Sequence, residues 1–118
     1  MKLNIILRTL LLWATLASLA GVDRAQTPRT IEMTAQRFAF EPNEITVKKG
    51  EPVILVIKSK DVNHGLVIED LGVRTEVKKG AATEVKFDPE TTGTFEGKCA
   101  HFCGKGHGSM TLTVHVTD

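Results

Sequence analysis

The chain has 118 residues, of which 42% are hydrophobic and 5% aromatic, and its formal charge is +1 at neutral pH. This length fits one small domain, whose hydrophobic core would be marginal without a metal or a disulfide. The near balance of basic and acidic residues gives no sign of a protein that binds nucleic acid.

Residues 1–25 have the pattern of an export signal. Within residues 1–20, two basic residues and no acidic one accompany an apolar run that ends at Ala20, where small residues suit cleavage. Ala25 is a second candidate cleavage site, weakened by Asp23 two places before it. The run is shorter than the roughly 20 residues of a membrane-spanning helix, so an uncleaved anchor is only the alternative. We expect a signal peptide within residues 1–25, a tether over 26–29 and one domain over 30–118, located in the periplasm or elsewhere outside the cytoplasm.

Removal of the apolar start hardly changes the charge of the chain. Cleavage after Ala20 takes Lys2 and Arg8 from the 15 basic residues and leaves 13 against 14 acidic ones, a formal charge of −1. A charge so close to zero gives no sign of a membrane-binding surface. We expect membrane contact only through an uncleaved signal or a partner complex.

The first half of the expected domain has the patterns of strands. Apolar residues alternate with polar ones from Ile31 to Ala35, and Phe38 and Phe40 continue this pattern until residues 41–43 break it. The apolar run over residues 53–57 is long enough only for a strand, which we expect to be central and buried on both faces.

The second half continues in the same way. Two Lys-Lys-Gly turns end at Gly50 and Gly80, and alternation returns over residues 83–87 and 110–116. Short strands at regular intervals without a convincing helical window predict an all-β domain, an antiparallel sandwich or small barrel.

The last predicted strand places two candidate ligands, Met110 and His115, on opposite faces. Successive side chains of a strand point to opposite faces, so Met110 shares the inward parity of Leu112 and Val114, whereas His115 points outward. Met110 is thus either a core residue or a ligand. His115 is expected to be an ordinary solvent-facing histidine.

Four side chains that soft metals prefer lie in one short stretch, namely Cys99, Cys103, His107 and Met110, with His64 far upstream. Their spacing also fits one face of an amphipathic helix. That helix would contain three glycines, each costing about 1 kcal/mol relative to alanine. It would also separate Cys99 from Met110 by about 16 Å. A glycine-rich loop that brings the side chains together is the favoured interpretation.

The donor types leave several kinds of site open. A zinc site of two cysteines and two histidines would leave Met110 without a role. One cysteine, two histidines and a methionine make a mononuclear blue-copper site, which leaves Cys99 unexplained. In an oxidising compartment the two cysteines could instead form a disulfide, although the short loop between them would contribute little stability.

These residues carry a resemblance that covers the chain from about Ala35 to Val116. The pattern Cys99, Cys103-Gly104, His107 and Met110 resembles that of the cupredoxin domain with a binuclear CuA copper centre, found in cytochrome c oxidase subunit II and nitrous oxide reductase. Residues 61–64 resemble the first-ligand segment of this family, and residues 40–50 resemble its opening strands. The resemblance implies a cupredoxin-like Greek-key β-sandwich.

The resemblance also implies a ligand set. Cys99 and Cys103 would bridge two copper ions, His64 and His107 would each bind one ion, and Met110 would be a weak ligand. The remaining ligand would be the backbone carbonyl of His101, a position where oxidase subunits commonly have glutamate. The His101 side chain is a departure that need not touch copper, but it could change partner contacts or create a competing metal site.

The function implied by the resemblance is electron transfer. Redox partners would be a cytochrome c or a terminal oxidase or reductase. No catalysis is expected from this domain alone, although it would serve as the electron-entry subunit of an oxidase complex. A copper carrier for oxidase assembly and a disulfide-stabilised binding module are the competing hypotheses.

Overall fold

The computed structural model describes residues 27–118, and the expected signal peptide lies outside the described residues. The described chain forms nine strands and two short 3₁₀ helices. The strands are β1 (Arg29–Gln36), β2 (Ala39–Glu41), β3 (Glu44–Lys48), β4 (Val53–Ser59), β5 (His64–Ile68), β6 (Val73–Val77), β7 (Thr83–Phe87), β8 (Gly93–Lys98) and β9 (Thr111–Thr117). The 3₁₀ helices are η1 (Glu69–Leu71) and η2 (His107–Ser109).

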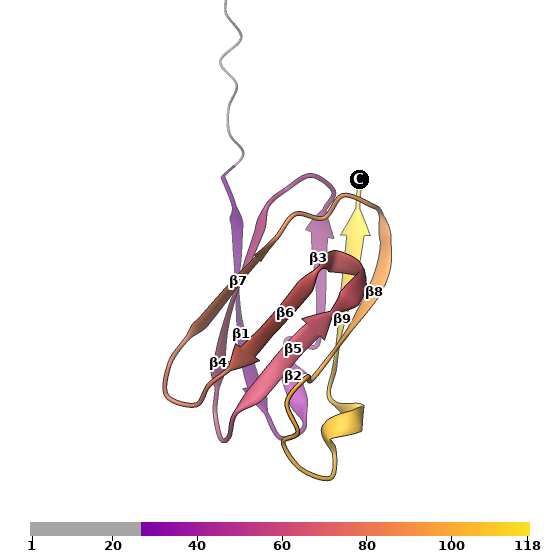
Figure 1. The fold of residues 1–118 in the computed structure, drawn as a ribbon. Coiled ribbons are helices and arrows are strands. Elements are labelled where there is room, and N and C mark those ends of the chain that lie inside the picture. Colours follow the sequence, from indigo (N-terminus) through magenta and orange to yellow (C-terminus); the bar gives the residue numbers. More distant parts are fainter. Residues whose placement is uncertain (1–26) are drawn as a thin grey trace, which may run out of the picture.

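Two sheets face each other in a sandwich (Figure 1). One has the order β2-β1-β4-β7 and the other β3-β9-β8-β5-β6. The all-β sandwich is therefore confirmed, but the antiparallel expectation was wrong in part, because β1 pairs in parallel with β4 and β3 in parallel with β9. These partners are distant in sequence and are joined by crossovers rather than hairpins, so their direction is not constrained by a tight turn.

The core lies between the sheets and is built by alternation. In β4, Val53, Leu55 and Ile57 have no exposed surface, whereas Ile54 and Val56 are half-buried on the other side. The strand is internal to its sheet, as predicted, but the expectation of burial on both faces was wrong. No second layer covers the outer face of this sheet among the described residues, so its apolar run is covered only in part by neighbouring side chains.

The expected long first strand is interrupted. Arg37 and Phe38 form a turn, after which β2 folds back antiparallel onto the end of β1. Phe40 is fully buried in the core, while Phe38 is 37% exposed. The alternation continues through this turn, so hydrophobic periodicity alone does not reveal it.

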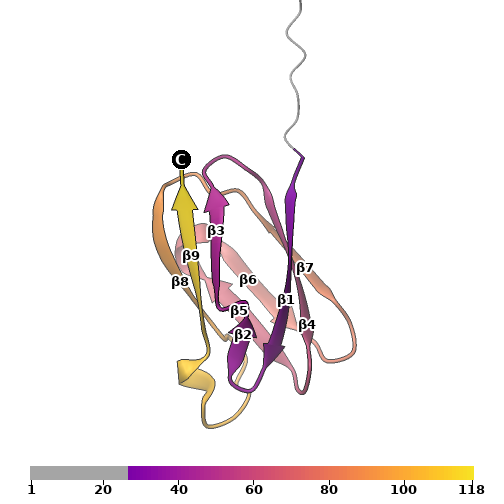
Figure 2. The ribbon, with the colours of Figure 1, turned by 180° about the vertical axis from the view of Figure 1, so that it is seen from behind.

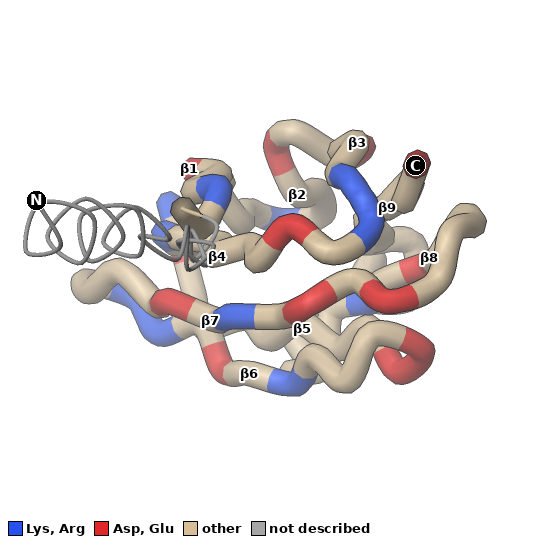
Figure 3. Tube along the Cα trace, turned by 90° about the horizontal axis from the view of Figure 1, so that it is seen from above, with Lys and Arg blue, Asp and Glu red and all other residues tan. Residues whose placement is uncertain are grey.

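The predicted Lys-Lys-Gly turns are confirmed. Gly50 and Gly80 have φ angles of 80° and 90°, in the left-handed region that glycine occupies without a steric cost. After the second turn, Figure 3 shows acidic and basic residues alternating along β7, where Glu84 and Lys86 are exposed.

The loop that joins β8 to β9 lies at the end of the sandwich opposite the C terminus (Figures 1 and 2). β5 begins at the same end, so a residue at its start lies close to this loop. Over residues 27–118, no helix has the length and apolar character needed to cross a bilayer.

Candidate metal centre

The loop over residues 99–110 is closed at its base. Cys99 follows β8 directly and Met110 precedes β9, and the Cys99 N–H donates a hydrogen bond of 3.1 Å to the Met110 carbonyl. The antiparallel pairing of β8 with β9 thus brings the two ends of the cysteine stretch side by side. The helical alternative is wrong, since the stretch has only the three-residue 3₁₀ helix at His107–Ser109.

The two thiols occupy the middle of the cluster. Cys99 Sγ and Cys103 Sγ are 3.8 Å apart, and both cysteines are buried and free of disulfides. Cys103 Sγ lies 3.7 Å from His107 Nδ1 and 3.9 Å from Met110 Sδ. A separation of 3.8 Å is well beyond the roughly 2 Å of a disulfide bond.

His64 reaches the cluster from the first position of β5. It has no exposed surface, and its Nδ1 atom lies 3.9 Å from Cys99 Sγ. On the other side of the ring, Nε2 lies 2.7 Å from Asp61 Oδ1. A carboxylate accepts, so Nε2 carries a proton, and Nδ1 is the ring nitrogen that faces the thiols and would bind a metal.

His101 takes part through its backbone. The Cys99 thiol lies 3.2 Å from the His101 carbonyl oxygen and donates to it. The His101 side chain is exposed. All six predicted groups are therefore brought together, and the ligand atoms of His64, Cys99 and Cys103 lie within 4.8 Å of one another.

Two ionisable groups of the cluster have shifted pKa values. Burial, together with the neighbouring Cys99 thiol, raises the pKa of Cys103 to about 11, so this residue is a neutral thiol in the metal-free protein near pH 7. Burial alone would raise the pKa of Asp61 as well. Hydrogen bonds from the Arg37 backbone and the His64 ring outweigh burial and lower the Asp61 pKa to about 2.

Two residues next to the site have contacts that the sequence analysis did not predict. Arg37 Nε donates a hydrogen bond of 2.9 Å to the Cys103 carbonyl, and the Phe38 ring lies against Gly104 and Gly106. Both residues are more than 60 positions upstream of the loop, and no spacing pattern connects them to it.

His115 lies away from the cluster, as predicted. It is half-buried on the outward face of β9, where its ring bonds to Glu44 and lies 3.1 Å from Thr94 Oγ1. Met110 is fully buried on the inward face of the same chain segment, with its sulfur atom at the cluster.

The donor set suits a soft or borderline metal. Thiolates and thioethers select copper(I), zinc and related ions, and imidazole suits copper and zinc. Two thiols, two imidazoles, a thioether and a carbonyl are more donors than the four of a structural zinc site. The residues present therefore fit copper.

The two-sheet fold is that of the cupredoxin class. Residues 6–113 match the family model of the cupredoxin-like domain, and the chain belongs to this family. Over 106 residues it is 31% identical to cytochrome c oxidase subunit 2 of Thermus thermophilus, covering 90% of this chain and 78% of that protein. The domain is thus similar to the copper domain of oxidase subunit II.

Two further comparisons agree with this assignment. The chain is 33% identical over 95 residues to nitrous-oxide reductase of Cupriavidus necator, covering 77% of this chain but only 15% of that enzyme. The periplasmic domain of cytochrome oxidase subunit II (CoxB) of Bradyrhizobium japonicum superposes with a TM-score of 0.71 at 22% identity, covering 76% of this chain and 84% of that one. The structural likeness confirms the cupredoxin fold.

Proposed function

We propose that this chain is an exported electron-transfer protein whose loop and His64 hold a binuclear copper centre of the CuA type. The observation that carries the proposal is the paired arrangement of donors. Cys99 Sγ lies 3.9 Å from His64 Nδ1, Cys103 Sγ lies 3.7 Å from His107 Nδ1, and the two sulfurs are 3.8 Å apart. Each thiol thus lies beside an imidazole of its own, and the two neighbouring pairs would hold two copper ions.

When bound, such a copper pair would supply a one-electron redox centre that changes geometry little between its oxidation states. The protein contributes a stiff set of ligands. His64 is held between Asp61 and the thiols, and the loop ends are tied across β8 and β9. Because Met110 is fully buried at the base of the loop, its thioether is held beside Cys103 and is out of contact with solvent.

Burial favours this function over copper delivery. A carrier passes its metal to another protein through exposed ligands, whereas His64, Cys99 and Cys103 have 0%, 4% and 5% exposed surface. We expect a copper chelator to strip the loaded protein slowly. Rapid and complete loss of copper would instead support the carrier hypothesis.

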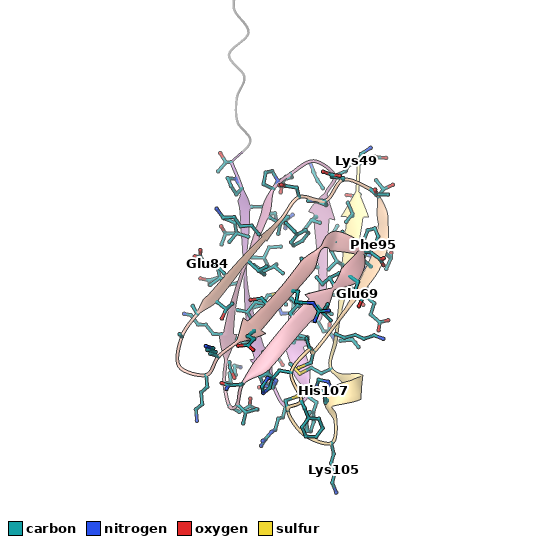
Figure 4. All side chains as sticks on the ribbon, in the orientation of Figure 1. Lys49, Glu69, Glu84, Phe95, Lys105 and His107 are labelled. Atoms are coloured by element: carbon teal, nitrogen blue, oxygen red, sulfur yellow. The ribbon has the colours of Figure 1, made fainter. Side chains whose placement is uncertain are left out.

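The same end of the molecule offers a surface for redox partners. Phe102 is 75% exposed, and its ring centroid lies 5.8 Å from that of His107. Figure 4 shows His107 and Lys105 at the tip of the sandwich farthest from Lys49. A cytochrome c or a terminal oxidase or reductase that docks at this tip would come within a short distance of the His107 ring.

The export part of the proposal rests on residues 1–25. We expect mature protein that begins after Ala20 or Ala25, with the tether over 26–29 and the domain over 30–118. Mass spectrometry of protein from the extracytoplasmic fraction tests this expectation. Intact mass with residues 1–20 retained would support the membrane-anchored alternative.

The deciding experiment is a copper-to-protein ratio with an electron paramagnetic resonance spectrum of the copper-loaded chain. Two coppers that share one unpaired electron would support the proposed centre. One copper with a blue-type spectrum would make the site mononuclear, and preferential zinc binding would remove the redox function. The Cys99→Ser variant should lose the two-copper spectrum, because it removes one bridging thiol, and an unchanged spectrum would exclude bridging by Cys99.

A further inference from the structure

The turn between β1 and β2 lies directly against the cysteine loop. Arg37 Nε donates its hydrogen bond of 2.9 Å to the carbonyl of Cys103, a residue 66 positions further along the chain. A hydrogen bond from a charged donor is stronger than one between neutral groups. The contact therefore ties the middle of the loop to the neighbouring sheet.

Phe38 fixes the position of the same loop from one side. A Cβ atom on Gly106 would lie 2.4 Å from Phe38 Cδ2, and one on Gly104 would lie 2.9 Å from Phe38 Cε1. Real Cβ atoms do not approach other heavy atoms so closely, so the ring and the glycine backbone are in direct contact. The loop rests on the aromatic ring at these two positions.

The turn is also connected to the other half of the donor set. The Arg37 N–H donates a hydrogen bond of 2.7 Å to Asp61 Oδ2, and Asp61 Oδ1 holds the His64 ring at 2.7 Å. Arg37 thus contacts Cys103 through its side chain and the partner of His64 through its backbone. Arg37 therefore links the segment that contains Asp61 and His64 to the cysteine loop, and these two segments must meet for the site to form.

We propose that Arg37 is a positioning residue. Its Nε–H donor, together with the Phe38 ring against the loop, holds residues 99–110 in the arrangement that binds metal, before any metal is bound. The part of this inference that concerns copper rests on the proposed function. The part that concerns the metal-free loop does not. The donor matters because it fixes the position of the Cys103 carbonyl, whereas water in its place would satisfy that carbonyl without holding the loop against the neighbouring sheet.

Three substitutions separate the donor from the charge. Arg37→Gln keeps an N–H donor on the atom that follows Cδ but removes the positive charge. Arg37→Lys keeps the charge but has a carbon at that position, and Arg37→Leu removes both features. Arg29→Leu is the matched control, since Arg29 also donates from its guanidinium to a backbone carbonyl, that of Thr46, at 3.1 Å and at the other end of β1.

The first readout is amide hydrogen exchange of the metal-free full chain over residues 99–110. We expect about five- to tenfold faster exchange in Arg37→Leu and Arg37→Lys, the effect of losing one part-buried hydrogen bond of ordinary strength from a locally opening segment. Arg37→Gln should remain close to the wild type, and Arg29→Leu should leave the loop unchanged. Unchanged loop exchange in Arg37→Leu would overturn the proposal.

A second pattern would overturn it as well. If Arg37→Lys matched the wild type while Arg37→Gln matched Arg37→Leu, the positive charge rather than the directed donor would be the cause. Thermal unfolding of each variant shows whether the whole sandwich has been weakened. An equal fall in the unfolding temperature of Arg37→Leu and Arg29→Leu, with the same loop exchange in both, would reduce Arg37 to an ordinary structural contact.

The second readout is copper retention by the loaded chain. Arg37→Leu and Arg37→Lys should release copper to a chelator about five- to tenfold faster than the wild type, with a changed visible spectrum, and Arg37→Gln should not. If the wild type itself holds no copper, the proposed function fails. The exchange experiment on the metal-free chain then still decides the positioning role, so the two failures are distinguishable.

Discussion

Met110 shows how one residue serves both the core and the cluster. It has no exposed surface, and its sulfur lies 3.9 Å from Cys103 Sγ. We expect Met110→Leu to keep the copper stoichiometry and to shift the reduction potential, because a thioether at an axial position tunes a copper site more than it holds the metal. Leucine nearly conserves the volume, so the free energy of unfolding should fall by less than about 1.5 kcal/mol.

A redox titration and the copper ratio of Met110→Leu test this expectation. His115→Ala is the control, since His115 lies on the outward face of β9 and contacts Glu44 and Thr94 rather than the cluster. Loss of most of the copper from Met110→Leu would show that the thioether is an essential ligand. An unchanged potential would show that Met110 is only a core residue.

Two glycines of the loop form a matched pair for a second test. A Cβ on Gly106 would lie 2.4 Å from the Phe38 ring, whereas a Cβ on Gly108 would have no heavy atom within 4 Å. We expect Gly106→Ala to lower the free energy of unfolding by about 1 to 3 kcal/mol through overpacking, and to weaken copper binding with it. Gly108→Ala should change neither by more than about 0.5 kcal/mol.

Chemical denaturation of both glycine variants, with and without copper, measures the difference. Phe38→Ala in the Gly106→Ala background should recover part of the lost stability, because it removes the ring that the new methyl group meets. Equal effects of the two glycine substitutions would contradict the contact between the loop and Phe38.

At the scale of elements, β4 and β8 show what alternation can and cannot predict. The apolar run of β4 predicted an internal strand correctly, but its outer face is only half-buried. β8 was not predicted, because its inward positions are held by Phe95 and Gly97 rather than by aliphatic residues. A Cβ on Gly97 would lie 2.9 Å from Ile68 Cγ1, so glycine lets β8 approach β5 closely.

The two faces of β4 can be compared with one residue type. Val53 has no exposed surface, and Val56 is half-buried on the opposite side of the strand. We expect Val53→Ala to lower the free energy of unfolding by about 2 kcal/mol, since it deletes buried methyl groups and leaves a cavity. Val56→Ala should cost less than about 1 kcal/mol. Equal losses in urea denaturation would mean that both faces are covered in solution.

For the whole molecule, the continuous core between the sheets determines how copper acts on stability. The buried apolar residues come from both sheets and extend to the cluster, which includes Cys99, Cys103 and Met110. We expect the metal-free domain to remain folded and copper to raise its unfolding temperature, with a gain of about 2.7 kcal/mol at a free copper concentration 100 times the dissociation constant.

Calorimetry of the metal-free and copper-loaded chain, with a chelator added to the second sample as control, measures this gain. An unfolding temperature that does not respond to copper would support the disulfide-stabilised binding module. Complete unfolding of the metal-free chain would show instead that the metal is required for the sandwich to form.

The sequence alone determined the all-β class, the inward parity of Met110 and the candidate donors. Each of these depends on residue type and short-range spacing, which a reader of the chain can inspect directly. The glycines of residues 104–108 argued against a helix for the same reason, because their cost is local. The resemblance extended the prediction from an all-β domain to the cupredoxin fold, which the family match confirms.

Only the tertiary structure decided which segments meet. The parallel partners of β1 and β3, the turn at Arg37 and Phe38, and the bond from Arg37 to Cys103 all join residues far apart in the chain. Their contacts arise because two curled sheets pack on one core, and that packing is a property of all the strands together. Hydrophobic periodicity records which face of a strand is buried, but it carries no information on which distant residue lies opposite.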